Sequence, residues 1–228
     1  MTVSISLIKY KYSSKLVEQW RNLGVKVILD EPLISLYRYL TKKVDIAMVT
    51  SMVLYLPQSI LLPQMPVVMS NGPVRNVLLI PCKKERTVKD TVRLWSTPQS
   101  RSGLTLALWY LSYIGFKKIK LLSNKEDADL CLYIGDYARE LSYLVEGSID
   151  LGREWFQLTK SPFIYAITVG WKLLRLPFRG YMWKEIIVTS LNDRIYEILE
   201  NQLEILRNYW YKISLLPDGI LGLLLRSA

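Results

Sequence analysis

Apolar and polar positions follow two different periods along residues 3–50, and the two periods alternate. The runs VSISLIK, VKVIL and DIAMV have the pattern of strands, whereas SSKLVEQWRNLG and EPLISLYRYLTKK carry apolar residues at helical spacing. The resulting order of strand, helix, strand, helix and strand is typical of a parallel α/β sheet. The next segment, PVVMSNGPVRNVLLIPC, predicts two more strands around a turn at Asn71-Gly72-Pro73.

A second α/β unit is predicted beyond the charged stretch from Lys83 to Lys89. It contains the strand VRLW, the polar loop TPQSRSG, the apolar helix LTLALWYLSYIG and the strands KIKLL and DLCLYIG. A short helix is predicted from Glu154 to Thr159, because Ser161-Pro162 disfavours its continuation. PFIYAITV then predicts a buried strand, and residues 183–211 predict a final helix.

This order of elements predicts an α/β protein with a two-lobed architecture like that of type II periplasmic binding proteins. Such a fold has two crossover segments and a ligand cleft between the lobes. We place the first crossing at Lys83–Lys89 and the return crossing in PFIYAITV. The first lobe would then be discontinuous, with residues 1–82 and 170–228, and the second lobe would contain residues 83–169.

Composition restricts the chemistry that the protein can perform. The 30 lysines and arginines exceed the 20 acidic residues, and the net charge of +10 favours an anionic partner. Because the basic residues lie in small separate groups, we expect a small anionic ligand rather than nucleic acid. The chain has no histidine, which excludes histidine bases, histidine-dependent nucleophiles and histidine metal sites. We expect no metal and no cofactor.

Cysteine usage and hydropathy bear on where the protein resides. Cys82 and Cys131 lie in apolar stretches without a CxxC pattern, which predicts two reduced, buried thiols in a cytoplasmic protein. The N-terminal residues MTVSISLIKYKYSSK lack the apolar core of a secretory signal. Three prolines interrupt the apolar run from Met52 to Val68, so no membrane span is predicted. The sequence leaves the oligomeric state open.

Ligands of open parallel sheets bind beyond the carboxyl ends of the strands, so the loops at these positions are the candidates for a site. The loop QSRSG favours an anion, because hydroxyls, a guanidinium group and main-chain N–H groups at a helix start all attract negative charge. The alternative is that Ser100 or Ser102 merely caps the helix, which is the commoner role of such serines. The candidate substrate-binding residues are Tyr12, Ser51, Asn76, Ser100, Arg101, Ser102, Gly103, Gly135 and Asp136.

Three acidic residues allow more than one role. Asp136 either faces a ligand or caps the helix that we expect to begin at Tyr137. Asp150 and Glu154 are either a pair of catalytic carboxylates or residues of a solvated hinge. No catalytic residue can be assigned from the sequence.

Four segments taken together resemble chorismate dehydratase of the futalosine route to menaquinone. They are DIAMVTSMVLY, SNGPVRNVLLI, LYIGDYA and IDLGREWFQLTKSPFIYA, in the same order as in that family. The last segment is the most specific, and it matches the family pattern at Asp150, Leu151, Gly152, Trp155, Thr159, Pro162, Phe163 and Ala166. The resemblance covers residues 3–170 and is weak after that.

The resemblance implies a cytoplasmic hydro-lyase with the two-lobed fold, which would remove water from the dicarboxylate chorismate to give 3-[(1-carboxyvinyl)oxy]benzoate. A carboxylate of the substrate would serve as the base. The chain departs from the family at Tyr12, Asn76 and Gly103, where the family has asparagine, serine and serine. One alternative is a binding module for a small carboxylate without catalysis. The related 1,4-dihydroxy-6-naphthoate synthase is disfavoured, because it depends on a histidine.

Overall fold

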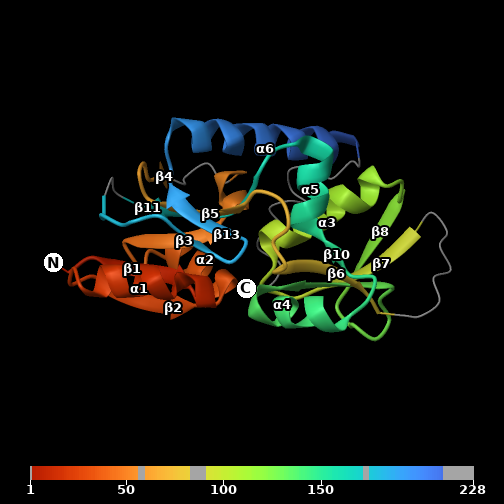
Figure 1. Ribbon diagram of the computed structural model, residues 1–228, viewed down its shortest axis with the longest axis horizontal. Helices are drawn as coiled ribbons and strands as arrows, with labels where there is room; N and C mark the ends of the chain where they lie inside the picture. Colours follow the sequence, from red (N-terminus) through yellow and green to blue (C-terminus); the bar gives the residue numbers. More distant parts are fainter. Residues whose placement is uncertain (1, 56–59, 83–90, 172–174, 213–228) are drawn as a thin grey trace. The chain divides into compact units, whose positions relative to one another are not determined.

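A computed structural model describes residues 2–55, 60–82, 91–171 and 175–212. The chain forms two compact α/β units, each with its own sheet (Figure 1). Unit 1 combines Met1–Ser70 with Ile164–Ala228, and unit 2 is the continuous stretch Asn71–Phe163. The predicted α/β class is confirmed.

The sheet of unit 1 has a parallel part and an antiparallel part. Its strands follow the order β12-β13-β5-β11-β3-β1-β2, and β4 pairs with β11 outside this path. The strands are β1 (Ser4–Ile8), β2 (Lys26–Asp30), β3 (Ile46–Thr50), β4 (Ile60–Leu61), β5 (Pro66–Ser70), β11 (Phe163–Gly170), β12 (Tyr181–Trp183) and β13 (Ile186–Ser190). β1 is parallel to β2 and β3, whereas β11 runs antiparallel to β3 with Ala166 opposite Thr50.

The helices of unit 1 build a core against this sheet. They are the 3-10 helices η1 (Lys11–Ser13) and η2 (Ser51–Tyr55), and the α-helices α1 (Ser14–Arg21), α2 (Pro32–Leu40) and α6 (Asp193–Lys212). One buried cluster joins Leu36 and Tyr39 of α2, Leu199 of α6, and strand residues that include Val49 and Ile167. The chain returning from unit 2 therefore contributes both a central strand and a helix to the core of unit 1.

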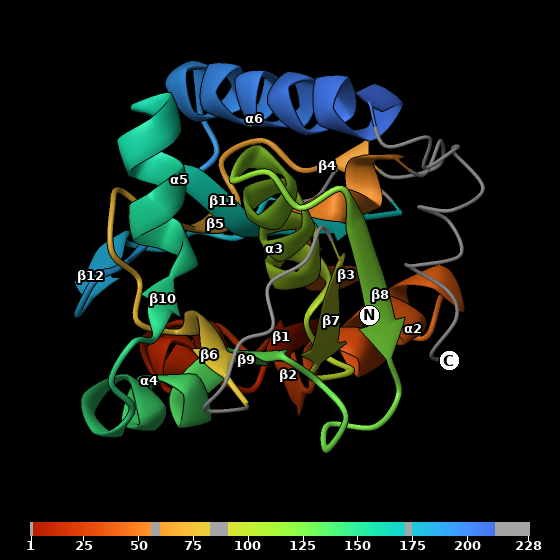
Figure 2. The ribbon, with the colours of Figure 1, turned by 90° about the vertical axis from the view of Figure 1, so that its right-hand side faces the viewer.

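Unit 2 is a sandwich of helices around a five-stranded sheet of order β10-β6-β9-β7-β8. The strands are β6 (Val77–Pro81), β7 (Thr91–Ser96), β8 (Lys118–Leu122), β9 (Leu130–Ile134) and β10 (Ile149–Asp150). The helices are α3 (Arg101–Tyr113), α4 (Gly135–Leu144) and α5 (Leu151–Thr159). β7 is parallel to β8 and β9, while β6 is antiparallel to β9. Figure 2 shows α3 and α5 on one side of β6 and β9, and α4 on the other.

The first crossing lies earlier along the chain than the predicted Lys83–Lys89, whereas the return crossing falls inside the predicted stretch PFIYAITV, a few residues before the predicted lobe boundary at 169/170. β6 hydrogen-bonds to β9 and β10 in the sheet of unit 2, so the first crossing falls between Ser70 and Asn71. The charged stretch Lys83–Lys89 falls outside the described residues, but β6 before it and β7 after it belong to the same sheet. The return crossing falls at Phe163/Ile164, since β11 pairs with β3 along most of its length.

The C-terminal third differs from the single helix predicted from residue 183. β12 and β13 form a hairpin, and Ile187–Ser190 pairs antiparallel with β5 before α6 begins at Asp193. The run IIVTS is rich in β-branched residues, which fit a pleated, half-buried surface better than a helix. Helical spacing of a few leucines and isoleucines was a weaker signal than this local preference.

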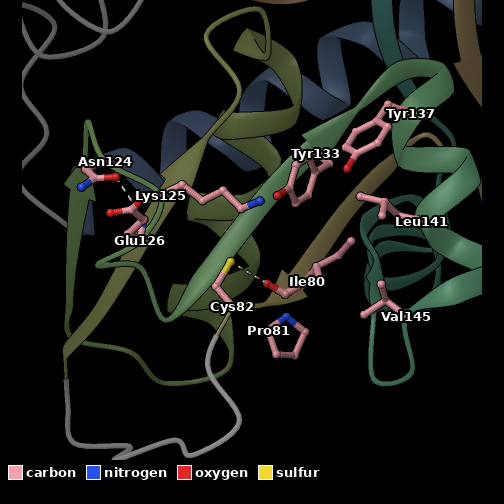
Figure 3. A pocket seen from close by; sticks show the side chains of 10 residues that line it. All are labelled: Ile80, Pro81, Cys82, Asn124, Lys125, Glu126, Tyr133, Tyr137, Leu141 and Val145. Atoms are coloured by element: carbon pink, nitrogen blue, oxygen red, sulfur yellow. Dashed lines mark hydrogen bonds between the residues drawn. The ribbon is translucent and has the colours of Figure 1, made fainter.

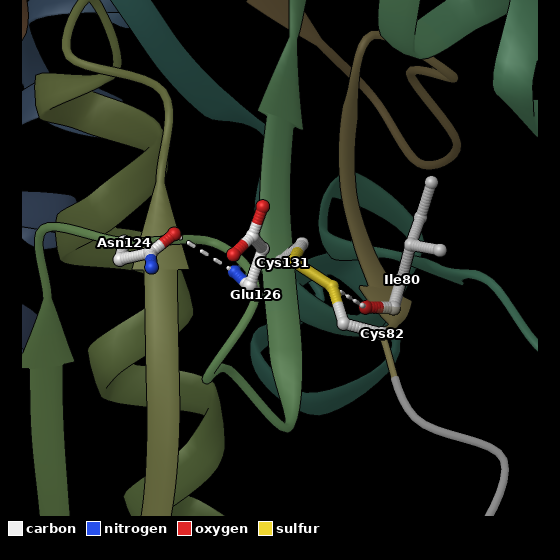
Figure 4. The surroundings of a disulfide bond; sticks show 5 residues. All are labelled: Ile80, Cys82, Asn124, Glu126 and Cys131. Carbon is white, nitrogen blue, oxygen red and sulfur yellow. Dashed lines mark hydrogen bonds between the residues drawn. A yellow bond between two sulfur atoms is a disulfide. The ribbon is translucent and has the colours of Figure 1, made fainter.

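Cys82 and Cys131 form a disulfide with Cα atoms 6.0 Å apart, which corrects the prediction of two reduced thiols (Figure 4). The register of β6 against β9 sets Ile80 opposite Cys131, so Cys82 lies diagonally across from Cys131 on the same face of the sheet. The two cysteines are 49 residues apart in the sequence, and only strand pairing brings them together. The cysteines consequently give no argument for a reducing compartment.

Among the described residues, no helix combines the length and the apolar character that a bilayer crossing requires.

Candidate functional site

Three chain segments meet at the carboxyl ends of β7 and β9 in unit 2. The antiparallel register sets Val77, at the start of β6, opposite Ile134, at the end of β9. The main-chain N–H of Gly135 donates to the carbonyl of Asn76 at 2.8 Å, and Ser96, at the end of β7, is paired with Leu132. This edge brings together seven predicted residues, namely Asn76, Ser100, Arg101, Ser102, Gly103, Gly135 and Asp136. We call it the unit 2 edge.

The N-terminus of α3 lies at this edge and begins earlier than predicted. Arg101 is the first helical residue, so Ser102 and Gly103 belong to the first turn rather than to a loop. Ser100 occupies the N-cap position without a side-chain cap hydrogen bond. Its hydroxyl is buried and has no hydrogen-bond partner among the described residues, and the same is true of the Thr97 hydroxyl. The capping alternative for Ser100 is therefore not what the structure shows.

Arg101 adds a desolvated positive charge at the same helix end. The residue is half-buried, and this burial lowers the pKa of its guanidinium from the ordinary value. A guanidinium with so high an intrinsic pKa remains charged. An anion nearby would offset the lost hydration, and the N-terminal dipole of α3 acts in the same direction.

Gly103 is required by close packing of α3 on the sheet. A Cβ atom there would overlap the Ser100 hydroxyl oxygen and would lie 3.1 Å from side-chain carbons of both Ile134 and Val77. Gly103, at the position where the family has a serine, thus lets α3 approach β6 and β9. Ser100, rather than position 103, presents a hydroxyl in this chain.

Changing Gly103 to alanine is expected to lower the free energy of unfolding by about 1–3 kcal/mol, because the added methyl group overpacks the contact with the side chains of Ser100, Ile134 and Val77. The shift in urea midpoint at unchanged slope measures this effect. Gly147→Ala is not a suitable comparison, since Gly147 has a positive φ of 75°. Thr105→Ala, at a half-buried position two residues further along α3, is the matched control, and we expect it to cost less. Equal stability of Gly103→Ala and the wild type would contradict the packing role.

The N-terminus of α4 forms the second wall of the unit 2 edge. Gly135 has a φ of 78°, a left-handed conformation that glycine adopts at low cost. Asp136 is in the first helical turn and is half-buried, and α4 has no side-chain cap hydrogen bond at its N-cap residue, Ile134. Asp136 is therefore not the cap of a helix that begins at Tyr137.

Arg139, which the sequence analysis did not single out, connects α4 to the loop before β6. Its Nε donates to the side-chain carbonyl of Asn76 at 3.1 Å, and a terminal nitrogen donates to the Val74 carbonyl at 3.2 Å. A guanidinium can only donate, so this contact fixes the orientation of the Asn76 amide. The Asn76 NH₂ group is buried and has no hydrogen-bond partner among the described residues. Arg139 stands one helical turn after Gly135, a spacing that points to the same side of α4.

Asp150 holds the loop that carries Asn76. Its carboxylate accepts hydrogen bonds from the N–H groups of Val74 and Arg75 at 3.0 and 2.8 Å, and from the N–H of Arg153 at 3.1 Å as the N-cap of α5. Asp150 is buried, and its carboxylate oxygens accept hydrogen bonds from the main chain. Asp150 therefore has a structural role, and neither a catalytic pair with Glu154 nor a solvated hinge describes it. Three segments of the family resemblance thus meet through Asp150 and through the hydrogen bond from Gly135 to Asn76.

Tyr12 and Ser51 lie in unit 1, at the carboxyl ends of β1 and β3. Tyr12 is buried, and its carbonyl accepts a hydrogen bond from the Tyr181 hydroxyl at 2.6 Å. Burial raises the pKa of Tyr181 to about 12, so this hydroxyl keeps its proton. The Ser51 hydroxyl donates to the Ile164 carbonyl at 2.8 Å, beside the buried Gln202. Both contacts hold the strands of unit 1 together.

Metal binding finds no support at these positions. Across the described parts of the chain, no group of three or more cysteine, aspartate or glutamate side chains is arranged to hold a metal ion. Besides the half-buried carboxylate of Asp136, the unit 2 edge offers mostly donors, namely a serine hydroxyl, an amide NH₂ group, a guanidinium and two helix N-termini. Such a set suits an anionic oxygen rather than a cation.

These features define the class of protein. Two α/β units, one discontinuous and one continuous, joined by two crossings, constitute a periplasmic-binding-protein-like fold. The chain belongs to the menaquinone biosynthesis family, whose model matches residues 7–176. This membership confirms the family resemblance of the four segments, supports a role in menaquinone biosynthesis and suggests that the protein is an enzyme.

Solved structures share the fold at low sequence identity. Protein AF1704 from Archaeoglobus fulgidus is 11% identical with a TM-score of 0.55, over 100% of this chain and 83% of that one. A protein from Bordetella bronchiseptica RB50 is 7% identical with a TM-score of 0.52, over 74% and 63% of the two chains. The alkanesulfonate-binding protein SsuA from Xanthomonas axonopodis is 15% identical with a TM-score of 0.46, over 99% of this chain and 78% of that one. No curated protein matches the sequence.

Proposed function

We propose that this protein is a chorismate dehydratase-like lyase, which converts chorismate to 3-[(1-carboxyvinyl)oxy]benzoate in menaquinone biosynthesis. Membership of the menaquinone biosynthesis family supports the pathway. The observation that carries the reaction is the set of buried donors at the unit 2 edge, where the Ser100 hydroxyl and the Asn76 NH₂ group have no partner among the described residues. A carboxylate of the substrate would satisfy these groups.

Each donor at the unit 2 edge has a proposed role. Ser100, Ser102 and the first N–H groups of α3 would bind one carboxylate of chorismate, and Arg101 would neutralise its charge. The Asn76 NH₂ group would hydrogen-bond a second oxygen of the ligand, next to the start of α4 at Gly135 and Asp136, where the Gly135 N–H is already donated to the Asn76 carbonyl. Tyr12 and Ser51 remain proposed contacts on unit 1, and Gly103 acts through the packing of α3.

The dehydration needs little chemistry from the side chains. A C–H bond and the neighbouring C–OH bond of the cyclohexadiene ring break, water leaves, and the ring becomes aromatic. The chain has no histidine to take the proton, so we propose that a carboxylate of the substrate is the base. The protein would then act by orienting the substrate and by stabilising negative charge with fixed donors.

The decisive experiment incubates the purified protein with chorismate and follows the enolpyruvyl benzoate by its absorbance and by liquid chromatography. Chorismate without protein is the control for its spontaneous reactions. Formation of the product at a rate proportional to protein concentration supports the lyase. Saturable binding of chorismate without product would favour the alternative, a binding module for a small carboxylate, and would overturn the proposed reaction.

Replacing Arg101 with methionine is expected to raise the KM for chorismate about tenfold, because a charge-assisted hydrogen bond is lost while the aliphatic volume is kept. Arg153→Met is the matched control, since Arg153 is an exposed arginine on α5 of the same unit. Circular dichroism and urea unfolding would show that both variants fold. If Arg101→Met and Arg153→Met behave alike, Arg101 does not bind the substrate.

The compartment in which the protein acts remains a prediction. Two reduced cysteines were one reason to expect the cytoplasm, and the disulfide between Cys82 and Cys131 removes that reason. A cytoplasmic location follows from the proposed reaction, since the substrate is a biosynthetic intermediate.

A further inference from the structure

Within the residues that the structure describes, helix α4 covers only part of one face of the unit 2 sheet. Leu78 and Ile80 of β6 and Cys131 and Tyr133 of β9 lie in a buried cluster on the face where α4 packs. α4 has ten residues, and its contribution to this cluster comes from Ala138, with Leu141 packed beside it. Further along the same face, Trp95, Leu122 and Cys82 are only half-buried.

The part of this face beyond α4 forms a pocket of about 530 Å³ (Figure 3). Its lining residues come from the end of β6, the loop after β8, β9 and α4. They are Ile80, Pro81, Cys82, Asn124, Lys125, Glu126, Tyr133, Tyr137, Leu141 and Val145. None of them belongs to the candidate residues of the unit 2 edge, so the pocket is a separate feature. Its volume lies within the range of about 300–1,000 Å³ that is usual for small-molecule sites.

The walls of the pocket combine aromatic and aliphatic surface. The rings of Tyr133 and Tyr137 meet edge to face with centroids 5.6 Å apart. Ile80, Leu141 and Val145 supply aliphatic surface on the side of β6 and α4. A planar ring would find both edge-to-face and aliphatic partners here, which is the arrangement that aromatic groups prefer.

Of the cations among the described residues, Lys125, in the loop after β8, reaches into this aromatic surface. The Lys125 ammonium lies 5.3 Å from the centre of the Tyr133 ring, and Figure 3 shows its side chain extending toward Tyr133. Interaction with the Tyr133 hydroxyl raises the pKa of Lys125, so the amine is charged at neutral pH. Glu126 lies beside Asn124, whose side-chain oxygen accepts from the Glu126 N–H at 3.1 Å, away from the tyrosines (Figure 3).

We propose that this pocket binds a small aromatic carboxylate, with its ring against Tyr133, Tyr137 and Leu141 and its carboxylate on the Lys125 ammonium. The phenol groups of the two tyrosines provide further hydrogen-bond donors beside the cation. A neutral aromatic molecule would leave the ammonium without an anion, and an aliphatic acid would leave the tyrosine rings without a stacking partner. The inference does not depend on the proposed lyase reaction.

The experiment uses the full chain and 1-naphthoate as the probe, with calorimetry and heteronuclear NMR as readouts. We expect a Kd of about 1 mM or tighter for 1-naphthoate, because drug-sized ligands gain about 0.3 kcal/mol of binding free energy per non-hydrogen atom. 1-Naphthalenemethanol, which lacks the charge, and cyclohexanecarboxylate, which lacks the aromatic ring, should each bind about tenfold more weakly or not at all. Amide shifts should concentrate at residues 124–126 and on α4.

Variants locate the binding. Lys125→Gln should weaken 1-naphthoate about tenfold, whereas Lys120→Gln, the same charge change at an exposed site on β8, should leave it unchanged. Val145→Trp should abolish binding by filling the pocket, and Lys125→Gln keeps the test decisive if that variant does not fold. Arg101→Met should bind 1-naphthoate with the same affinity as the wild type.

Two results would overturn the proposal. One is the absence of measurable 1-naphthoate binding by the wild type. The other is binding that survives Lys125→Gln but is lost in Arg101→Met, which would assign the probe to the unit 2 edge. Neither result bears on whether chorismate is dehydrated, so the two proposals fail independently.

Discussion

Replacing Asp150 with alanine is expected to lower the free energy of unfolding by about 3–5 kcal/mol. The carboxylate accepts from the main-chain N–H groups of Val74, Arg75 and Arg153, and the residue is buried. Without it, these donors lose their acceptor, and α5 loses its N-cap. The displacement of the urea midpoint at unchanged slope measures the loss.

Two comparisons make the Asp150 result specific. Asp127→Ala removes an exposed aspartate from the same unit and should change stability by less than about 0.5 kcal/mol. Asp150→Asn keeps the shape and one acceptor oxygen, so it should fall between the wild type and Asp150→Ala. Loss of one helix N-cap costs about 1 kcal/mol of stability. If Asp150→Ala loses less than that, the loop before β6 does not depend on this carboxylate.

The Trp155→Ala variant should be destabilised by about 3–5 kcal/mol as well, through a cavity in the core of unit 2. The indole is fully buried between the rings of Trp109 and Phe163, with centroids 4.7 and 5.1 Å away. Its N–H donates to the Pro162 carbonyl at 3.2 Å. Because α3 packs against α5 through this contact, loss of near-ultraviolet circular dichroism should accompany the loss of stability.

The matched control for Trp155 is Leu144→Ala, which truncates a large apolar side chain that is 79% exposed on α4. It should cost less than about 0.5 kcal/mol. Trp155→Phe should be intermediate, since it keeps most of the apolar volume and removes the hydrogen bond to Pro162. If Trp155→Ala unfolds at the same urea concentration as Leu144→Ala, the buried indole is not a core residue.

The strands and helices of both units were largely predictable because local signals agreed with the final packing. β1, β2, β3, β9 and β11 lie where alternating or continuous apolar runs predicted them. Errors arose where two local signals competed. At the start of α3, Arg101, Ser102 and Gly103 have loop-forming composition, yet they form the first turn of the helix, where Gly103 packs closely on the sheet.

The candidate site was predicted in its residue types and only partly in its roles. Asn76, Ser100 and Gly135 could be named because loops after strands carry ligands in α/β folds. Arg139 was missed, since a lone arginine inside a helical segment has no distinguishing signal until its contact with Asn76 is seen. Asp150 was named for a different role, because its three main-chain donors come from two segments far apart in the sequence.

The sequence by itself determined the class of fold, the family and the chemistry that a chain without histidine excludes, since these follow from periodicity, motif and composition. Tertiary structure alone decided the positions of the crossings, the disulfide and the partners of Asp150 and Arg139. The physical reason is strand pairing over long sequence separations. β6 pairs with β9 and not with β5, so the domain boundary lies before β6. The same pairing brings Cys82 to Cys131 and Asn76 to Gly135.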